Sequence, residues 1–423
     1  MHIVVLTMYY APDLTGIAST ATCLCEYLAT AGHRVSVLTG PPHYPQWKVP
    51  EAYKGKWWLR ETIKGVEVHR GYVFLPSRRT TIRRILYDTS VAVSSIFTGL
   101  AVKDADVILA ITPPLQLGLT GLFLSRLSKA PLVLKVQDLV PDLAIAVGML
   151  RNRFAIGLAH RMERYVYQKS AAILLLSQGF MGNVKSKGIA ESKLVLHPLC
   201  VDTESIRPMA RDGQWRKRFN LTEEQFVILH AGNMGAKQKL ENVLDAAVKL
   251  RQEKNLVFVF VGDGTEKPRL EAYARERGLS SVRFLALQPR EGLPDMLSCA
   301  DVLLLNQSAT IVDMVMPSKL LSYMAAGRPV VAAANAHSDA ADCIRRAECG
   351  LVVPPDDPEA LAGAIRSIYR DSQFADRLGR MGRLYAEENF AQDRNLKFFE
   401  GVLNTLAAGG EPPLSMSAAT SGT

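Results

Sequence analysis

The sequence predicts an α/β protein with two doubly wound, Rossmann-like domains, each built on a parallel sheet. Three observations predict this fold class. The chain has 423 residues, and because one hydrophobic core stops growing at roughly 250–300 residues, two cores are expected. Short apolar runs with strand character alternate with longer helical segments, which is typical of βαβ units. The alternation pauses once, in a polar stretch at residues 202–218, and then starts again.

The first half predicts seven strands separated by helical segments. Their residues are 2–7, 34–39, 65–70, 107–111, 132–136, 173–176 and 194–196. An amino-terminal domain is therefore expected over residues 1–205.

The second half repeats the pattern with six predicted strands, at residues 227–230, 256–261, 282–285, 302–305, 330–333 and 351–353. They predict a second domain over residues 206–390. The last helical stretch, residues 372–406, is long enough for residues 391–407 to cross back to the first domain. Residues 408–423 are rich in Ala, Gly, Pro and Ser and are expected to be disordered. Because parallel sheets bind ligands beyond the carboxyl ends of their strands, two such domains facing each other predict a central cleft.

The composition, with 48% hydrophobic and 22% charged residues, is that of a globular enzyme. The six cysteines form no Cys-x-x-Cys pair, which argues against a zinc site and a disulfide framework. The first residues lack the basic segment of a secretory signal, so a cytosolic protein is expected. Residues 85–102 are apolar but interrupted by Asp88, which favours a buried or interface-lying helix over a transmembrane one. The net charge of +9 suits nucleic acid, an anionic membrane or a phosphorylated substrate equally well.

The loop after the first strand, residues 9–18, contains Gly16 just before a predicted helix. Gly16 would let the backbone approach a ligand closely, and the free amides at the helix start would favour an anion. The loop is not a Gly-x-Gly-x-x-Gly fingerprint, and a plain strand-to-helix turn explains it equally well.

The corresponding loop of the second half, residues 230–240, combines Gly232, Asn233 and Gly235 with Lys237. Glycines, a helix start and ammonium groups together predict a diphosphate cradle without a Walker sequence. A third loop, Gly262-Asp263-Gly264, also ends a strand, although a tight turn explains it as well as a ligand does.

A short helix is predicted between Pro317, which suits its first position, and Gly327, which suits the position after its end. Ser318 and Lys319 lie at its amino-terminal end, where the helix dipole is positive. An oxyanion placed there would meet backbone amides, a hydroxyl and a cation together. A capped core helix explains the apolar face of this segment but not the lysine.

With these motifs the sequence resembles family 4 of the retaining glycosyltransferases, which have the GT-B fold, and within it the bacterial exopolysaccharide branch that includes the colanic-acid transferases. The resemblance covers nearly the whole chain. It is carried by Tyr10-Ala11-Pro12 with Gly16, by Gly232-Asn233-x-Gly235 with Gln238, by Gly262-Asp263-Gly264, and by Met316-Pro317-Ser318-Lys319 running into Tyr323-Met324-Ala325-Ala326-Gly327.

The resemblance implies sugar transfer with retention of anomeric configuration and no required metal or cofactor. The first domain would bind the acceptor, and the second would bind the nucleoside-diphosphate-sugar donor. By position, Gly235, Lys237 and the helix start at Ser318 and Lys319 would hold the diphosphate. Leu287 and Gln288 would face the base, and Gly16 would lie against the donor on the acceptor side. The branch suggests a GDP-sugar such as GDP-fucose, and UDP-sugars remain open.

The sequence departs from the family pattern at two places. Many members have two glutamates that bracket the short helix, and here the matching positions hold Met314 and Ser322, with Asp313 beside the first. Either Asp313 takes over the contact with a sugar hydroxyl or no such contact is made.

A histidine often found in the first domain is matched by Gln137, which is followed by Asp138. Asp138 is the candidate to orient or deprotonate the acceptor hydroxyl, and a helix-capping role is nearly as good an explanation. Asp138, Lys319 and Asp313 are thus the candidate catalytic residues.

Four arginines at residues 78–84 precede an apolar helix. Our hypothesis is that residues 78–87 contact anionic lipid at the inner face of the plasma membrane and the diphosphate of a polyprenyl-linked acceptor. A solvated basic face is an equal alternative. The predicted function is transfer of a hexose or deoxyhexose to a growing lipid-linked oligosaccharide in extracellular polysaccharide biosynthesis. A nucleotide-sugar epimerase is the main rival, and a basic nucleic-acid-binding protein is a weaker alternative. Nucleic acid is not an expected partner, because no aromatic residues interleave with the arginines.

Overall fold

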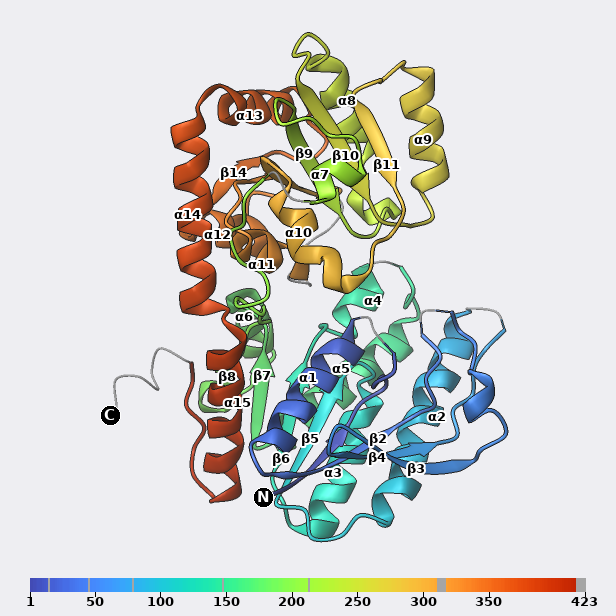
Figure 1. Cartoon of the computed structure of the whole chain (residues 1–423). Helices are drawn as coiled ribbons and strands as arrows, with labels where there is room; N and C mark the ends of the chain where they lie inside the picture. The colour runs from blue at the N-terminus through green and yellow to red at the C-terminus, as the bar shows by residue number, and fades with distance from the viewer. Residues whose placement is uncertain are drawn as a thin grey trace. The chain divides into compact units, whose positions relative to one another are not determined.

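The computed structural model describes residues 1–13, 16–44, 46–77, 80–146, 148–211, 214–309 and 317–415 (Figure 1). It divides into two compact units. Unit 1 consists of Met1–Pro198 and Asn395–Thr423, and unit 2 consists of Leu199–Arg394.

Unit 1 contains an eight-stranded sheet in the order β3-β4-β2-β1-β5-β6-β7-β8. The strands are β1 (His2–Leu6), β2 (Arg34–Thr39), β3 (Trp58–Ile63), β4 (Val66–Gly71), β5 (Val107–Thr112), β6 (Leu132–Val136), β7 (Ala172–Leu175) and β8 (Leu194–Leu196). All neighbours pair in parallel except β3 and β4. Strand order reverses at β1, with β2 on one side and β5 on the other, so this is the switch point of a doubly wound sheet.

Strand β3 was not predicted from the sequence. It is an edge strand whose side chains alternate between exposed and half-buried, so it lacks the continuous apolar run of a central strand. It joins β4 through Lys64 and Gly65, both of which have positive φ, as a two-residue hairpin requires.

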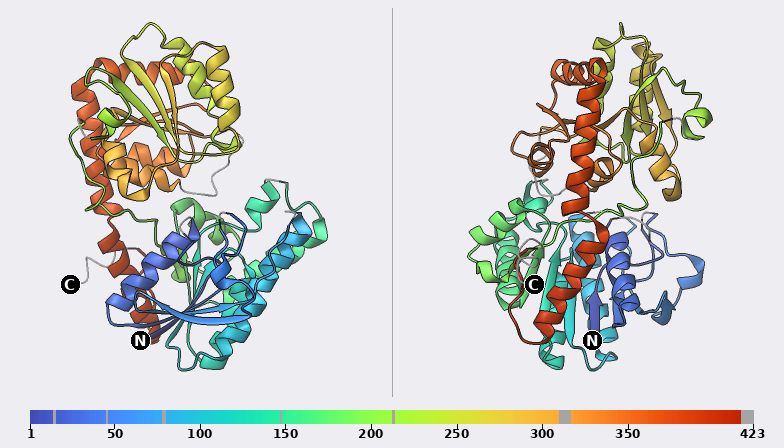
Figure 2. Two further views of the ribbon diagram at one scale, coloured as in Figure 1. Left: turned by 45° about the vertical axis from the view of Figure 1, so that its right-hand side comes forward. Right: turned by 60° about the vertical axis from the view of Figure 1, so that its left-hand side comes forward.

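The helices of unit 1 cover both faces of its sheet (Figure 2). They are α1 (Ile17–Thr30), α2 (Thr81–Leu100), α3 (Gln116–Ser128), α4 (Asp142–Ala146), α5 (Arg153–Lys169), α6 (Gln178–Ser186) and most of α15 (Gln392–Ala407). Helices α1 and α15 share a hydrophobic cluster with strand residues such as Val5 and Val37. A Cβ atom on Gly99 of α2 would contact Leu38, the next residue of β2, so α2 packs on the opposite face.

Unit 2 contains a six-stranded, wholly parallel sheet in the order β11-β10-β9-β12-β13-β14. Its strands are β9 (Phe226–Ala231), β10 (Leu256–Val261), β11 (Val282–Leu285), β12 (Val302–Asn306), β13 (Val330–Ala333) and β14 (Gly350–Val353). Its helices are α7 (Gln214–Arg218), α8 (Glu241–Lys249), α9 (Lys267–Glu276), α10 (Leu293–Ser298), α11 (Ser318–Ala325), α12 (Asp339–Arg346), α13 (Pro358–Arg370) and α14 (Ser372–Asn389). One hydrophobic cluster fills each face of the sheet. The predicted class of two Rossmann-like parallel-sheet domains is confirmed.

The chain divides at residues 198 and 199 rather than at residue 205. The reason is backbone pairing of Val201, whose N–H donates to Phe390 O at 2.9 Å and whose carbonyl accepts from Gln392 N at 3.0 Å. The same contact separates α14 from α15 within the predicted stretch 372–406.

The tail expected to be disordered is partly described. Residues 408–415 are described, and the Leu196 N–H donates to the Leu414 carbonyl at 2.9 Å, so the tail contacts the end of β8. Residues 416–423 lie outside the described residues. Among the described helices, none has both the length and the apolar character needed to span a bilayer.

Candidate functional site

The candidate site of unit 2 lies at the carboxyl ends of β9 and β10, beside the start of α11. Strand order in this sheet reverses between β10 and β12 on either side of β9. A doubly wound sheet binds its ligand at such a reversal, because the loops that leave the two neighbouring strands diverge to opposite faces. The loop of residues 232–235, which follows β9, is therefore in the position of a ligand-binding loop.

Backbone contacts join this loop to the loop after β10. The Met234 N–H donates to Asp263 O at 2.8 Å, and the Met234 carbonyl accepts from Glu266 N at 3.0 Å. Gly262 has φ +145°, and a Cβ atom there would overlap the Gly232 carbonyl oxygen. Gly262 is needed for this close approach of two backbones, so the third predicted loop braces the second one.

Gln238 and Asn306 fix the shape of the β9 loop. The Gln238 side-chain carbonyl Oε1 accepts from Gly235 N at 3.1 Å. Asn306 donates through Nδ2 to the backbone carbonyls of Gln238, at 2.7 Å, and Lys239, at 3.1 Å. Sequence reasoning missed Asn306, although a polar residue that ends the apolar strand β12 is a recognisable signal.

Helix α11 begins next to this loop. Its N-cap is Pro317, with no side-chain hydrogen bond to the cap, and Ser318 is exposed. The buried Tyr323 fastens the helix to the end of β9, because its hydroxyl accepts from Ala231 N at 3.1 Å and lies 3.3 Å from Ala231 O. The helix start is thus held at the carboxyl end of β9, and no side chain among the described residues caps its positive dipole end.

Lys319 is the most unusual group of this site. Its ammonium nitrogen Nζ is buried and has no hydrogen-bond partner among the described residues. A Cβ atom on Gly232 would lie 3.6 Å from Nζ, so the ammonium faces the β9 loop. Burial lowers the pKa of Lys319 to about 8. Burial, and next the nearby charge of Lys319, hold the pKa of His230 far below its usual value. A buried ammonium without a partner is costly, and an anion at this position would relieve that cost.

Other predicted site residues of unit 2 lie on the same group of loops. A Cβ atom on Gly235 would lie 2.9 Å from Asn233 Nδ2, which places the Asn233 side chain over the loop. Asp263 accepts from Gly264 N at 2.8 Å through Oδ1, and its side chain is exposed. Lys237 is also exposed, and its carbonyl accepts from Ser308 N at 2.9 Å.

The remaining predictions for unit 2 have less defined surroundings. Leu287 is exposed after β11, and Gln288 donates through Nε2 to Ala286 O at 2.9 Å. Ser322 is half-buried in α11, four residues after Ser318. Asp313, Met314 and Met316 lie outside the described residues.

In unit 1, Gly16 is the N-cap of α1, with φ +59° and no side-chain cap. The neighbouring Asp13, which sequence reasoning passed over, is buried and accepts through Oδ1 from the backbone amides of His43, at 3.0 Å, and Tyr44, at 3.1 Å. Burial raises the pKa of Asp13 to about 6. Nε2 of His43 in turn lies 2.7 Å from the Tyr87 hydroxyl. This contact connects the loop after β1, which contains Asp13, and the loop after β2, which contains His43, to α2.

Gln137 and Asp138 follow β6, whose neighbour β5 lies at the switch point of the unit 1 sheet. The Gln137 N–H donates to Thr112 O at 2.9 Å. The Gln137 side chain is buried, and its Nε2 atom has no hydrogen-bond partner among the described residues. Asp138 is half-buried, four residues before α4 begins. The structure therefore places Asp138 at the carboxyl edge of the sheet, where a ligand of unit 1 would bind.

The chain matches two family models: "Glycosyl transferase 4-like domain" over residues 15–200 and "Glycosyl transferases group 1" over residues 212–385. It is 32% identical over 407 residues to the putative colanic acid biosynthesis glycosyl transferase WcaI of Escherichia coli (strain K12), covering 94% of this chain and 98% of that protein. It is 25% identical over 305 residues to the probable glycosyltransferase WbjE of Pseudomonas aeruginosa, covering 72% and 76%.

Two solved structures show the same fold. The sucrose-phosphate synthase from Thermosynechococcus elongatus aligns with a TM-score of 0.73 and 18% identity, over 97% of this chain and all of that one. Anabaena Alr3699/HepE, described in complex with UDP-glucose, aligns with a TM-score of 0.69 and 15% identity, over 96% and 99%. Both family models, the near full-length relative and the shared fold lead to one conclusion: the chain belongs to the family 4 glycosyltransferases of GT-B fold.

Proposed function

We propose that this glycosyltransferase moves a hexose or deoxyhexose from a nucleoside-diphosphate sugar, with retention of anomeric configuration, to a lipid-linked oligosaccharide. One observation carries the proposal. The buried ammonium of Lys319 has no partner among the described residues and faces the glycine loop after β9, beside the uncapped start of α11. A pyrophosphate is the kind of anion that would pair with a lysine and helix amides together.

The reaction needs positive charge at this place. When the bond between the anomeric carbon and the diphosphate breaks, negative charge develops on the leaving oxygen. Fixed dipoles and cations stabilise such a charge without reorganising during the reaction. Lys319, the amides at Ser318 and the amides of the 232–235 loop would supply that potential, and we therefore propose transfer that requires no metal ion. Gln238 would act by positioning Gly235, because its side chain already accepts from the Gly235 amide.

Unit 2 would bind the donor. Leu287 and Gln288, after β11, would contact the base, and Ser322 would contact the nucleotide one turn into α11. Support for a nucleotide-sugar donor comes from HepE, whose structures are described with UDP and with UDP-glucose. Asp313 would contact a hydroxyl of the donor sugar.

Unit 1 would bind the acceptor. Asp138 would orient or deprotonate the acceptor hydroxyl, since a carboxylate can accept the proton that transfer releases. Similarity to a putative colanic acid biosynthesis glycosyl transferase supports a role in extracellular polysaccharide synthesis. The enzyme would act at the inner face of the plasma membrane. Residues 78–87 would contact the lipid-linked diphosphate. Within that run Arg84 pairs with Asp88 at 3.0 Å, and Arg78 and Arg79 lie outside the described residues.

A thermal-shift panel of UDP, GDP, ADP and dTDP tests the donor site. A nucleotide at about 100 times its Kd stabilises the native state by about 2.7 kcal/mol, which raises Tm by several degrees. We expect one base to give the largest rise, and we expect Lys319→Met to abolish it. Lys254→Met, an exposed lysine of the same unit, is the matched control and keeps the rise.

The proposal fails if no nucleotide raises the Tm of the wild type, or if Lys319→Met responds as the wild type does. Incubation of the donor without acceptor separates the rival activity, because an epimerase would convert the sugar and a transferase would not.

A further inference from the structure

Helix α2 is apolar on the side that faces solvent as well as on the side that faces the sheet. Tyr87 and Val91 are buried toward the core. The exposed apolar side chains lie one or two helical turns apart along the helix, so they form one stripe. They are Ile82, Ile85, Leu86, Val93, Phe97 and Leu100, with exposures of 72% at Ile82 and 64% at Phe97. A helix on the surface of a globular domain normally turns polar side chains to this side.

Helix α3, which packs against α2, and helix α5, which packs against α3, carry similar stripes. Leu119, Phe123 and Leu127 are exposed at four-residue spacing on α3. On α5, Phe154 is 90% exposed and Leu158 is 70% exposed, one turn apart, and Tyr165 follows on the same side. We call the exposed apolar residues of α2, α3 and α5 together the apolar face.

The three stripes adjoin because glycines bring the helices close together. A Cβ atom on Gly99 of α2 would lie 2.6 Å from Leu124 of α3. A Cβ atom on Gly118 of α3 would lie 2.5 Å from Val166 of α5. Larger residues at these positions would push the helices apart, so the apolar face is one surface and not three isolated ridges. An exposed apolar surface of this extent marks an interaction site.

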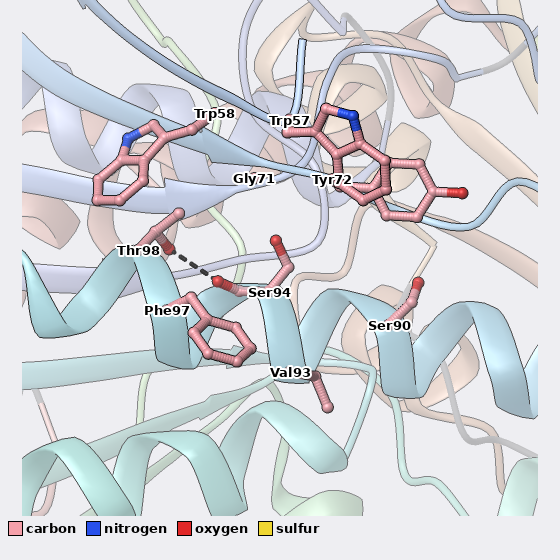
Figure 3. A pocket seen from close by; sticks show the side chains of 9 residues that line it. All are labelled: Trp57, Trp58, Gly71, Tyr72, Ser90, Val93, Ser94, Phe97 and Thr98. Atoms are coloured by element: carbon pink, nitrogen blue, oxygen red, sulfur yellow. Dashed lines mark hydrogen bonds between the residues drawn. The ribbon is translucent and has the colours of Figure 1, made fainter. Parts of the chain in front are cut away.

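An aromatic groove borders the apolar face on the side of the hairpin β3–β4 (Figure 3). Its cavity of about 360 Å³ is lined by Trp57, Trp58 and Tyr72 from the hairpin and by Val93 and Phe97 from α2. The Trp57 and Tyr72 rings stack with centroids 4.7 Å apart. Exposed Trp and Tyr side chains are enriched where a protein meets the boundary between lipid headgroups and acyl chains.

The charged side chains of α2, α3 and α5 are mostly positive. The three helices carry the basic residues Arg83, Arg84, Arg126, Arg153, Arg161, Arg164 and Lys169. Their two acidic residues are both engaged: Asp88 pairs with Arg84, and the fully buried Glu163 pairs with Lys187 at 2.7 Å. Two copies of this face would repel each other, whereas an anionic lipid surface would attract it.

We propose that the apolar face and its aromatic groove insert into the interface of an anionic bilayer. The aliphatic and phenylalanine side chains lie among the acyl chains, the tryptophans lie at the headgroup boundary, and the arginines contact lipid phosphates. The inference rests on the proposed function only in that a lipid-linked acceptor explains why the enzyme needs a membrane. It extends that contact from residues 78–87 to three helices and makes it hydrophobic as well as electrostatic.

Vesicle co-sedimentation of the full chain tests the proposal, with phosphatidylglycerol mixed into phosphatidylcholine and with phosphatidylcholine alone. We expect stronger binding to the anionic vesicles. Ile85→Ser/Phe97→Ser and Phe154→Ser/Leu158→Ser should each lower the ratio of bound to free protein about tenfold or more, since each removes two inserting side chains. Met209→Ser/Leu384→Ser replaces two exposed apolar residues of unit 2 and is the matched control, with binding unchanged.

Tryptophan fluorescence measures how deeply the protein inserts into the bilayer. The chain has four tryptophans, Trp47, Trp57, Trp58 and Trp215. Lipids brominated on their acyl chains should quench the wild type, and Trp57→Phe/Trp58→Phe should lose most of that quenching. Unchanged sedimentation of both apolar-face variants, or quenching that survives in the tryptophan variant, overturns the proposal. A lipid-free dimer that the same serine variants convert to a monomer also overturns it, because the face would then be an interface between copies.

Nucleotide-induced thermal shifts of the same variants separate the two proposals. The apolar-face variants should keep the wild-type shift, because their residues are in unit 1 and the donor site is in unit 2. Vesicle binding without any nucleotide response in the wild type would sink the proposed function and leave this inference standing. A nucleotide response in the wild type without vesicle binding would overturn this inference and leave the proposed function standing.

Discussion

A Cβ atom on Gly232 would lie 3.6 Å from the Lys319 ammonium, so a side chain of α11 is held against the backbone of the loop that follows β9. The contact joins two segments almost ninety residues apart. It puts a buried positive charge where no described residue neutralises it.

Replacing Lys319 should therefore make the free protein more stable and less active. Lys319→Met removes a charge whose burial lowers its pKa from 10.5 to about 8, and we expect the free energy of unfolding at pH 7 to rise by about 1–3 kcal/mol. Between pH 8 and 10.5 the unfolded wild type holds a proton that the native state has lost, so wild-type stability rises over this window and that of Lys319→Met does not. Urea unfolding of the wild type and of Lys319→Met at pH 7, 8 and 10 measures both the difference at pH 7 and the rise of wild-type stability with pH. A Lys319→Met variant that is less stable than the wild type at pH 7 would refute the prediction.

Nucleotide affinity should fall as the pH rises through about 8. Below that pH the Lys319 ammonium is charged and attracts the diphosphate, and above it binding must first recover a proton. The affinity should drop by up to about tenfold per pH unit above 8. Titration calorimetry from pH 7 to 9.5 measures the profile. Lys319→Met should bind weakly with a flat profile over this range, and a wild-type profile that is flat would exclude Lys319 from the donor site.

Gly262→Ala should destabilise unit 2. The added Cβ atom would overlap the Gly232 carbonyl oxygen, and φ +145° is unfavourable for alanine. We expect a loss of about 2–4 kcal/mol in the free energy of unfolding. Gly363→Ala is the matched control, since an added Cβ in α13 meets nothing within 4 Å, and there we expect a gain of about 0.5–1 kcal/mol. Equal unfolding midpoints for the two variants would show that the loops after β9 and β10 can separate enough to accommodate the added Cβ atom.

Asp301→Ala should cost about 3–5 kcal/mol in the free energy of unfolding, because it leaves the buried Arg216 guanidinium without its carboxylate partner. Asp301 accepts through Oδ2 from Arg216 Nη2 and from Val227 N, both at 2.8 Å. The exposed pair Lys249–Glu359, also 2.8 Å, is the comparison, and Glu359→Ala should change stability by at most about 0.5 kcal/mol. Thermal or urea unfolding of both variants measures the two losses of stability. Equal losses would show that burial does not make the Asp301–Arg216 pair more important for stability than the exposed pair.

Asp138→Asn should slow sugar transfer about 10²- to 10⁴-fold if the carboxylate accepts the acceptor proton. The nucleotide-induced thermal shift should stay as in the wild type, because the proposed donor site is in unit 2. A transfer rate within about threefold of the wild type would assign Asp138 a structural role.

The buried strands and the glycine loops could be read from local sequence. Strands such as β5 and β10 are buried along their whole length, so their apolar runs stand out from the helices around them. The loops after β9 and β10 could be recognised by composition, because glycine is favoured where φ is positive and is needed where two backbones touch. Pro317 and Gly327 delimited the short helix α11 in the sequence, because proline is favoured at the start of a helix and glycine just after its end.

Contacts between distant segments could not be read that way. The sequence shows a glycine at position 262 but not why it is needed. The structure shows that Gly262 packs against the Gly232 backbone, so that the loop after β10 supports the loop after β9. The sequence placed Lys319 at a helix start, and folding buries its ammonium near the end of β9 with no hydrogen-bond partner among the described residues. The stripe on α2 was read as a buried or interface-lying helix, and its exposure depends on which side the sheet covers. Local pattern records the conformation a residue needs, whereas charge burial and exposed apolar area depend on segments that meet only when the chain is folded.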